Sequence, residues 1–297
     1  MMNRLLRWIG TVFGSLIVLA VVAYAVVYVL SERILRRTYE VPAVDLSIPT
    51  DAESIVQGRR LAIVRGCFNG CHGKQAEGMV MFDEAMIARI VAPNLTAAVH
   101  KYSDAELAII VRNGLRPDGR STIAMPSEAF AGLSDADLGR IIAFLKSLPR
   151  EAGPQANVSP GPLGRIGLVT GKFRTAAQLI EKTIPPPEAT SEVGERGRYL
   201  ARTICAECHG TSLSGYSTPD FDAPDLRLVA AYSLEQFAEL MRTGAALGQR
   251  NLVTMSTWAR THLSSLTGEE ISALYSYLHS MPGASTQKKQ GDTTITY

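Results

Sequence analysis

The chain has 297 residues, and its 30 lysine and arginine side chains nearly balance its 28 aspartate and glutamate side chains, for a formal net charge of +2. This overall balance says little about partners, but no pattern of interleaved basic and aromatic residues suggests nucleic acid as a partner. All four cysteines fall in two short strings, which confines cysteine chemistry to two places.

An uncharged stretch near the start predicts a membrane helix. Residues Trp8 to Leu30 carry no charge, and at ~1.5 Å per residue such a helix reaches roughly 34 Å, enough for one bilayer crossing. Arginines flank the stretch on both sides, so they do not settle its orientation. Ala23-Tyr24-Ala25 can be read as a signal-peptidase site. Because the apolar run continues beyond it, we expect residues 1–30 to be an uncleaved anchor.

A tether over residues 31–52 leads to the first cysteine string, Cys67-Phe68-Asn69-Gly70-Cys71-His72, here called the first motif. It resembles the C-x-x-C-H pattern of covalent haem attachment, with one extra residue between the cysteines. In such a site both thiols add to the haem vinyl groups and the histidine is an axial ligand of the iron. Since Asn69 and Gly70 tolerate left-handed geometry, we expect a bulge and two thioether bonds. A single thioether through Cys71 is the alternative.

Helix signals follow the first motif. Ser103 and Glu106 have the spacing of a capping box, and Gly114 is typical of a helix C-terminus. Met125 comes eleven residues after that glycine, and apolar residues at helical spacing predict a last helix within residues 133–149.

Residues 151–190 are expected to be a linker. They begin and end rich in proline, with a short helix predicted around residues 172–182. The linker is either a plain spacer or a helical piece that packs against the units on both sides and sets their separation.

The second string, Cys205-Ala206-Glu207-Cys208-His209, is a regular C-x-x-C-H sequence. It is here called the second motif, and the landmarks around the first motif recur around it. The paired segments are Gly58–Leu61 with Gly197–Leu200, Ala92–Leu95 with Ala223–Leu226, Tyr102–Gly114 with Tyr232–Gly244, Met125 with Met255, and Leu133–Pro149 with Leu266–Pro282. Neither copy shows a strong period-2 pattern, so we expect no strand. The polar tail over residues 284–297 is expected to be disordered.

The doubled unit resembles two tandem class I cytochrome c domains, over residues 53–150 and 191–283. The whole order is similar to that of small membrane-anchored diheme cytochromes of bacteria. The resemblance implies an all-α fold, with an N-terminal transmembrane helix followed by two tandem class I cytochrome c-like helical domains. It also implies two covalently bound haem c groups, attached through Cys67 and Cys71 and through Cys205 and Cys208.

The resemblance also implies the ligands of the iron. His72 and His209 are the proximal ligands, and methionines in the loop before each last helix, Met125 and Met255, are the sixth ligands. His100 and His262 are the rivals. The prolines of the repeated segment are expected to accept a hydrogen bond from the proximal imidazole through their carbonyls; they are Pro93 and Pro224. His279 and the methionines Met79, Met81, Met86, Met241 and Met281 are expected to pack or face solvent.

Two other uses of the cysteines fit the strings less well. A structural zinc site usually has four Cys or His ligands, whereas each string here supplies two cysteines and one histidine. A disulfide within either string would close a very small ring. The repeat favours haem over both.

His/Met ligation raises the reduction potential and leaves no open coordination position, so we expect an electron carrier rather than an enzyme. The expected place is the bacterial cytoplasmic membrane, as a single-pass protein with its haem domains in the periplasm. Expected partners are a dehydrogenase or quinol-oxidising complex on one side and a terminal oxidase or soluble cytochrome on the other. The alternative is a diheme redox enzyme of peroxidase or thiosulfate-oxidising type with one labile ligand. A haem sensor is disfavoured because no signalling domain follows.

Charge differs between the two units. Residues 55–150 carry a balance of +3, from 12 basic and 9 acidic side chains, and residues 192–282 carry −3, from 7 and 10. The difference is either scatter in small numbers or a sign that each unit faces a different partner.

Overall fold

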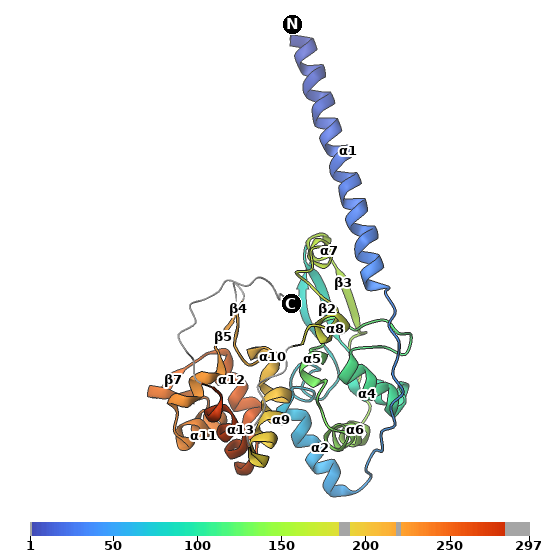
Figure 1. Cartoon of the computed structure of the whole chain (residues 1–297). Coiled ribbons are helices and arrows are strands. Elements are labelled where there is room, and N and C mark those ends of the chain that lie inside the picture. The colour runs from blue at the N-terminus through green and yellow to red at the C-terminus, as the bar shows by residue number, and fades with distance from the viewer. Residues whose placement is uncertain (1, 184–190, 218–220, 283–297) are drawn as a thin grey trace.

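The computed structural model describes residues 2–183, 191–217 and 221–282. Helix α1 (Met2–Leu35) projects from the rest of the molecule (Figure 1). Its section Arg4–Leu35 is long and apolar enough to cross a membrane, and its apolar side chains from Leu5 to Leu30 are exposed except for the half-buried Val27. The apolar segment found in the sequence therefore lies within one continuous helix.

The first unit is a set of helices around one apolar cluster, followed by a segment that packs onto it. Ser103 and Glu106 form the expected capping box, and Gly114 ends that helix with φ of 60°. The helices are α2 (Ala52–Val64), α3 (Leu95–Lys101), α4 (Asp104–Asn113), α5 (Ser127–Phe130) and α6 (Asp135–Ser147).

The second unit repeats this order, and its capping boxes at Ser233 and Thr267 are also present. Its longer elements are α9 (Glu192–Leu200), the π-helical turn η1 (Ala201–Cys205), α10 (Ala206–His209), η2 (Leu226–Ala231), α11 (Leu234–Thr243), α12 (Thr254–Thr261) and α13 (Gly268–Ser280). The short elements are β4 (Tyr216–Ser217), β5 (Asp222–Ala223), β6 (Ala245–Ala246), η3 (Leu247–Gln249), β7 (Arg250–Asn251) and η4 (Leu263–Ser265).

In each unit the first and last helices cross at a glycine. A Cβ atom on Gly58 of α2 would lie 1.9 Å from the carbonyl oxygen of Arg140 in α6. A Cβ atom on Gly197 of α9 would lie 2.1 Å from the carbonyl oxygen of Ala273 in α13. The repeated glycines noticed in the sequence therefore let two helix backbones touch.

The expectation that the chain contains no strand was wrong, so the fold is mostly rather than wholly helical. Strands β1 (Met79–Glu84), β2 (Ala88–Ala92) and β3 (Asn157–Pro160) form an antiparallel sheet, with Glu84 paired to Ala88 and Ala88 paired to Pro160. Every residue of β1 is exposed. With no buried face there is no alternation of apolar and polar residues, so the period-2 signal is missing.

The segment expected as a linker adds structure to the first unit. Strand β3 extends the sheet, α7 (Pro162–Val169) packs on α1, and α8 (Ala176–Ile180) packs on α4 and α5. The short helix is present, capped by Thr175 and Gln178, and is shorter than expected. Residues 184–190 of the linker and the tail 284–297 lie outside the described residues.

The two units pack against each other. Helix α5 contacts η1 and α10, and α2 contacts η4. The side chain of Tyr199 on α9 packs against the apolar clusters of both units. The two motifs are thus carried by parts of the chain that lie together, although they are far apart in sequence.

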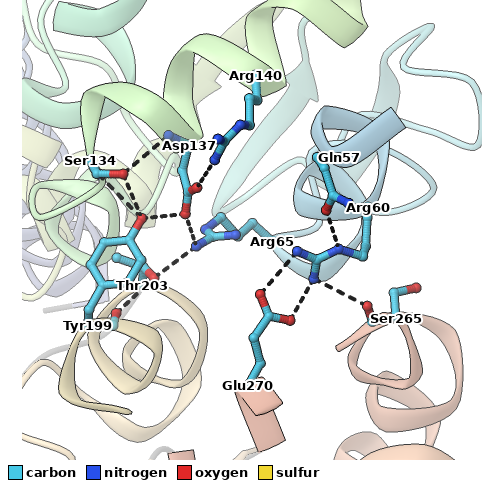
Figure 2. A network of polar contacts seen from close by, with 10 residues as sticks. All are labelled: Gln57, Arg60, Arg65, Ser134, Asp137, Arg140, Tyr199, Thr203, Ser265 and Glu270. Atoms are coloured by element: carbon cyan, nitrogen blue, oxygen red, sulfur yellow. Dashed lines mark hydrogen bonds and ion pairs between the residues drawn. The ribbon is translucent and has the colours of Figure 1, made fainter. Parts of the chain in front are cut away.

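A polar network spans the contact (Figure 2). Arg65, at the end of α2 and only 3% exposed, donates to Thr203 Oγ1 at 3.2 Å and lies 3.4 Å from Asp137 Oδ2. Arg60 donates to both carboxylate oxygens of Glu270, at 2.6 and 3.1 Å. Buried charges need such partners. Two of the three partner side chains, Thr203 and Glu270, belong to the second unit, whereas both arginines belong to the first.

Candidate functional site

The first motif forms a tight turn directly after α2. The backbone N–H of Cys71 donates to the carbonyl of Gly66 at 2.9 Å, and Asn69 takes φ of 57°. The extra residue is therefore accommodated as a left-handed bulge of the kind expected. His72 follows the bulge, and its Nδ1 donates to the carbonyl oxygen of Pro93 at 2.9 Å.

The second motif is helical instead. The turn η1 ends at Cys205, and α10 carries Cys208 and His209. Nδ1 of His209 donates to the carbonyl oxygen of Pro224 at 2.8 Å. In both motifs this bond fixes the proton on Nδ1, so Nε2 keeps the lone pair that a metal ligand needs.

After each histidine the backbone follows the same path, which sequence reasoning missed. In the first copy the carbonyl of His72 accepts from Gly78 N–H at 2.7 Å, and Ala76 takes φ of 63°. In the second, His209 accepts from Gly215 N–H at 3.0 Å, and Leu213 takes φ of 61°. The sequence pattern that marks this path is a glycine at the first and another at the sixth position after each histidine.

The final glycine of this path brings the proline to the histidine. A Cβ atom on Gly78 would lie 2.7 Å from the carbonyl oxygen of Ala92, and one on Gly215 would lie 2.9 Å from that of Ala223. These backbones can approach so closely only at glycine. Between Gly78 and Pro93 the first unit inserts the hairpin β1–β2, where the second has the short pair β4–β5.

One cavity of about 600 Å³ joins most of the expected residues of the first site. Cys67 and Met125 both line it although they are far apart in sequence, with Met125 in the loop directly before α5. Its lining includes Cys67, Cys71, His72, Pro93 and Met125, together with the apolar side chains of Ile90, Val91, Ile110, Ile123 and Phe130.

The same cavity contains a buried cation with unused donors. Arg65 lines it, and within the described part of the chain its Nε and Nη1 have no hydrogen-bond partner. A buried guanidinium left this way is costly unless an acceptor reaches it. Haem is a largely apolar macrocycle with two carboxylate groups, so the apolar walls and the free donors of Arg65 fit it.

Burial holds the thiols and imidazoles neutral. It raises the pKa of Cys67 to about 11 and that of Cys71 to about 12, and it raises the pKa of both Cys205 and Cys208 to about 12. Burial also lowers the pKa of His72 and His209, against the opposing effect of their proline hydrogen bonds. Neutral imidazole is the form that binds a metal.

Glu207, inside the second motif, also lines the first cavity. Burial raises the pKa of its carboxyl to about 7, with a smaller contribution from the charge of Glu128. The second motif thus contributes a side chain to the wall of the first site, so the two sites are neighbours.

The two candidate methionines are placed differently. Met125 lines the first cavity, as does Met81 of β1, which sequence reasoning assigned to packing or solvent. Met255 lies in the first turn of α12 and packs against the same apolar cluster as Cys205. A residue with positive φ comes shortly before each, Ala124 with φ of 66° and Val253 with φ of 50°. Strained residues of this kind cluster at functional sites.

The rival histidines have other surroundings. His100 is exposed at the end of α3. His262 is 5% exposed, with Nε2 donating to the carbonyl of Asn69 at 3.1 Å and Nδ1 2.6 Å from Thr261 Oγ1. Its ring stacks on Trp258 at 3.7 Å. His262 of the second unit therefore supports the bulge of the first motif. His279 is exposed beside Tyr275.

The four cysteines are free rather than joined in disulfides. Structural zinc requires four Cys or His ligands, and within residues 2–183, 191–217 and 221–282 no group of three or more His, Cys, Asp or Glu side chains is arranged to hold a metal ion.

Comparison with known proteins gives two findings. The sequence model of the family described as Cytochrome c matches residues 55–149 and 194–282, together more than half of the chain. The fructose dehydrogenase cytochrome subunit of Gluconobacter japonicus is 24% identical over 258 residues. That alignment covers 77% of this chain and 53% of the relative, so the chain spans about half of the relative's length.

Proposed function

Because the chain belongs to the cytochrome c family, it is an electron carrier rather than a catalyst, and we propose that it is a membrane-anchored diheme cytochrome that serves a dehydrogenase. The observation that carries this proposal is the doubled histidine–proline hydrogen bond, each copy next to its own pair of cysteines. The family implies covalent haem c, and the two copies support two such groups.

In each unit the residues have distinct tasks. The two cysteines tether the group, the histidine supplies Nε2, and the proline carbonyl holds the imidazole in one tautomer. When bound, haem c supplies an iron that accepts and releases one electron. Met125 and Met255 are proposed as the opposite ligands. In the first site, Arg65 would donate to a haem carboxylate.

The proposed arrangement is two tandem domains over residues 53–150 and 191–283, separated by the linker over 151–190. The structure adds residues 157–180 to the surface of the first unit, so the proposed first domain carries part of this linker. The buried contact between the units would hold the two haem groups at one separation.

Helix α1 is proposed as the membrane anchor, with the haem domains in the periplasm, where bacterial haem c is attached. The donor is proposed to be a periplasmic or membrane dehydrogenase, because the relative is a cytochrome subunit of a dehydrogenase. A quinol-oxidising complex is the other proposed donor, and a terminal oxidase or soluble cytochrome is the proposed acceptor.

The number of haem groups tests the proposal. The full chain, purified from membranes in mild detergent, is denatured in alkaline pyridine, and haem is measured against protein concentration. We expect two haem c per chain in the unaltered protein. Where loss of the histidine ligand prevents attachment, His72→Ala and His209→Ala should each leave one haem c per chain. One haem in the unaltered chain would refute the diheme proposal. Identification of co-purifying dehydrogenase subunits tests the partner separately.

A further inference from the structure

We propose that a small apolar surface beside the end of α1 rests in the headgroup region of the lipid bilayer, as a second membrane contact. This membrane-facing patch consists of Met86 in the β1–β2 turn and Leu163 and Ile166 on α7, which are 54%, 51% and 41% exposed. The inference rests on the proposal that α1 spans the membrane.

The patch is one continuous and firmly built surface. The backbone N–H of Leu163 donates to the carbonyl of Met86 at 2.8 Å, and Ile166 follows Leu163 by one helical turn on the same face. A Cβ atom on Gly164 would lie 2.0 Å from the carbonyl oxygen of Ile87. Helix α7 is therefore pressed against the hairpin turn, and the apolar side chains point away from that contact.

Arg165, on the same turn of α7, fixes the position of the patch along the axis of α1. Its guanidinium lies 4.0 Å above the ring of Tyr28 and donates to Ser31 Oγ at 2.8 Å and to Glu32 Oε1 at 3.0 Å. Figure 1 shows α7 beside the last turns of α1. Since the apolar run ends at Leu30, Tyr28 lies ~3 Å inside that end. The patch consequently sits at the level where the hydrocarbon region gives way to headgroups.

The chemistry at this level favours lipid as the occupant. Tyrosine and arginine are enriched at membrane interfaces, and the side chains of α1 next to this level, Val26 and Val29, are themselves exposed and apolar. The exposed Arg33 and Arg36 follow the apolar run, with Arg36 also paired to Glu32 at 2.8 Å, and arginine suits lipid phosphates. The patch thus continues the apolar surface of the proposed anchor, and two contacts would fix how the first unit stands on the membrane.

Spin labels at three positions test this in the full, haem-loaded chain, reconstituted in nanodiscs of phosphatidylcholine and phosphatidylglycerol. Leu163→Cys reports the patch and Leu19→Cys reports the anchor. Val56→Cys is the control, because it is 67% exposed on α2, at the end of the first unit away from α1 (Figure 1). The unaltered chain, labelled in parallel, measures any reaction of Cys67, Cys71, Cys205 and Cys208.

Relaxation by oxygen is compared with relaxation by a water-soluble nickel chelate. We expect oxygen to dominate at residues 19 and 163, with the label at 163 shallower, and nickel to dominate at 56. If the label at residue 19 lies in lipid but the label at residue 163 is as accessible to nickel as the label at residue 56, this inference alone is overturned. The patch would then be a contact surface for a partner protein. A label at 19 in water would overturn both the anchor and the patch. Neither result bears on the haem count.

Discussion

At the residue scale, one added position decides the form of the first motif. Asn69 adopts left-handed geometry, its carbonyl accepts from His262, and Cys67 and Cys71 both line one cavity. The bulge therefore leaves both thiols facing the same space, despite the longer path between them.

We predict two thioether bonds at this motif. Reduced and alkylated protein is digested, and the peptide that contains Cys67 and Cys71 is analysed by mass spectrometry. Neither cysteine should carry the alkyl group, as in the control peptide that contains Cys205 and Cys208. An alkylated Cys67 beside a haem-bound Cys71 would show that a single bond is formed.

A second prediction concerns the sixth ligands. Met125→Ala and Met255→Ala should each remove one site's contribution to the weak near-infrared methionine–iron band, and the double variant should remove the band. Each should also lower the reduction potential of its own site, because methionine ligation raises it. The spectra of the oxidised protein give the first readout and redox titration the second.

Met81→Ala is the matched control, because Met81 lines the same cavity as Met125. The near-infrared methionine–iron band of the Met81→Ala variant should be unchanged. If Met81→Ala loses the contribution of the first site and Met125→Ala keeps it, Met81 rather than Met125 is the sixth ligand of that site.

At the scale of elements, the units depend on two helix crossings in which backbones touch. The glycines at these crossings have no room for a methyl group, since the nearest atoms belong to carbonyls of the facing helix. This explains why a glycine, unfavourable inside a helix, stands at the same place in both copies.

We predict that Gly58→Ala and Gly197→Ala each destabilise the protein by roughly 1–3 kcal/mol, because overpacking forces the helices apart. Thermal unfolding of each variant measures the effect. Gly268→Ala on α13 is the control, since its added Cβ would meet only Arg242 Nη2 at 3.8 Å. Unfolding temperatures equal to that of the control would contradict the role given to the crossings.

At the scale of the whole molecule, the contact between the units depends on paired charges. Burial by itself would raise the pKa of Glu270, but the hydrogen bonds from Arg60 and the backbone of Thr267 outweigh it and lower that pKa below its usual 4.5. A lowered pKa means that the folded state favours the carboxylate. Its stabilising contribution is complete above the unfolded value and is lost as the pH falls through the folded value.

We predict that Glu270→Gln costs about 1.5–3 kcal/mol at pH 7, the range for hydrogen bonds to charged groups. The difference from the unaltered chain should shrink as the pH falls below 4.5, the unshifted value of this carboxyl. Denaturant unfolding at pH 7 and below pH 4.5 measures it. Glu269→Gln is the matched control, because that side chain is 85% exposed. A difference independent of pH would mean that the charge of Glu270 does not hold the units together.

The amino-acid sequence by itself determined the two motifs, the repeat, the capped helices and the apolar segment of α1. These features depend on residues only a few positions apart, so their spacing is visible in the chain. Only the tertiary structure decided that strand β1 pairs with β2 without a buried face, that Arg65 lines the first cavity, and that His262 of one unit supports the bulge of the other. Such contacts join residues up to 193 positions apart, and no local periodicity encodes which distant surfaces will meet when the apolar clusters close.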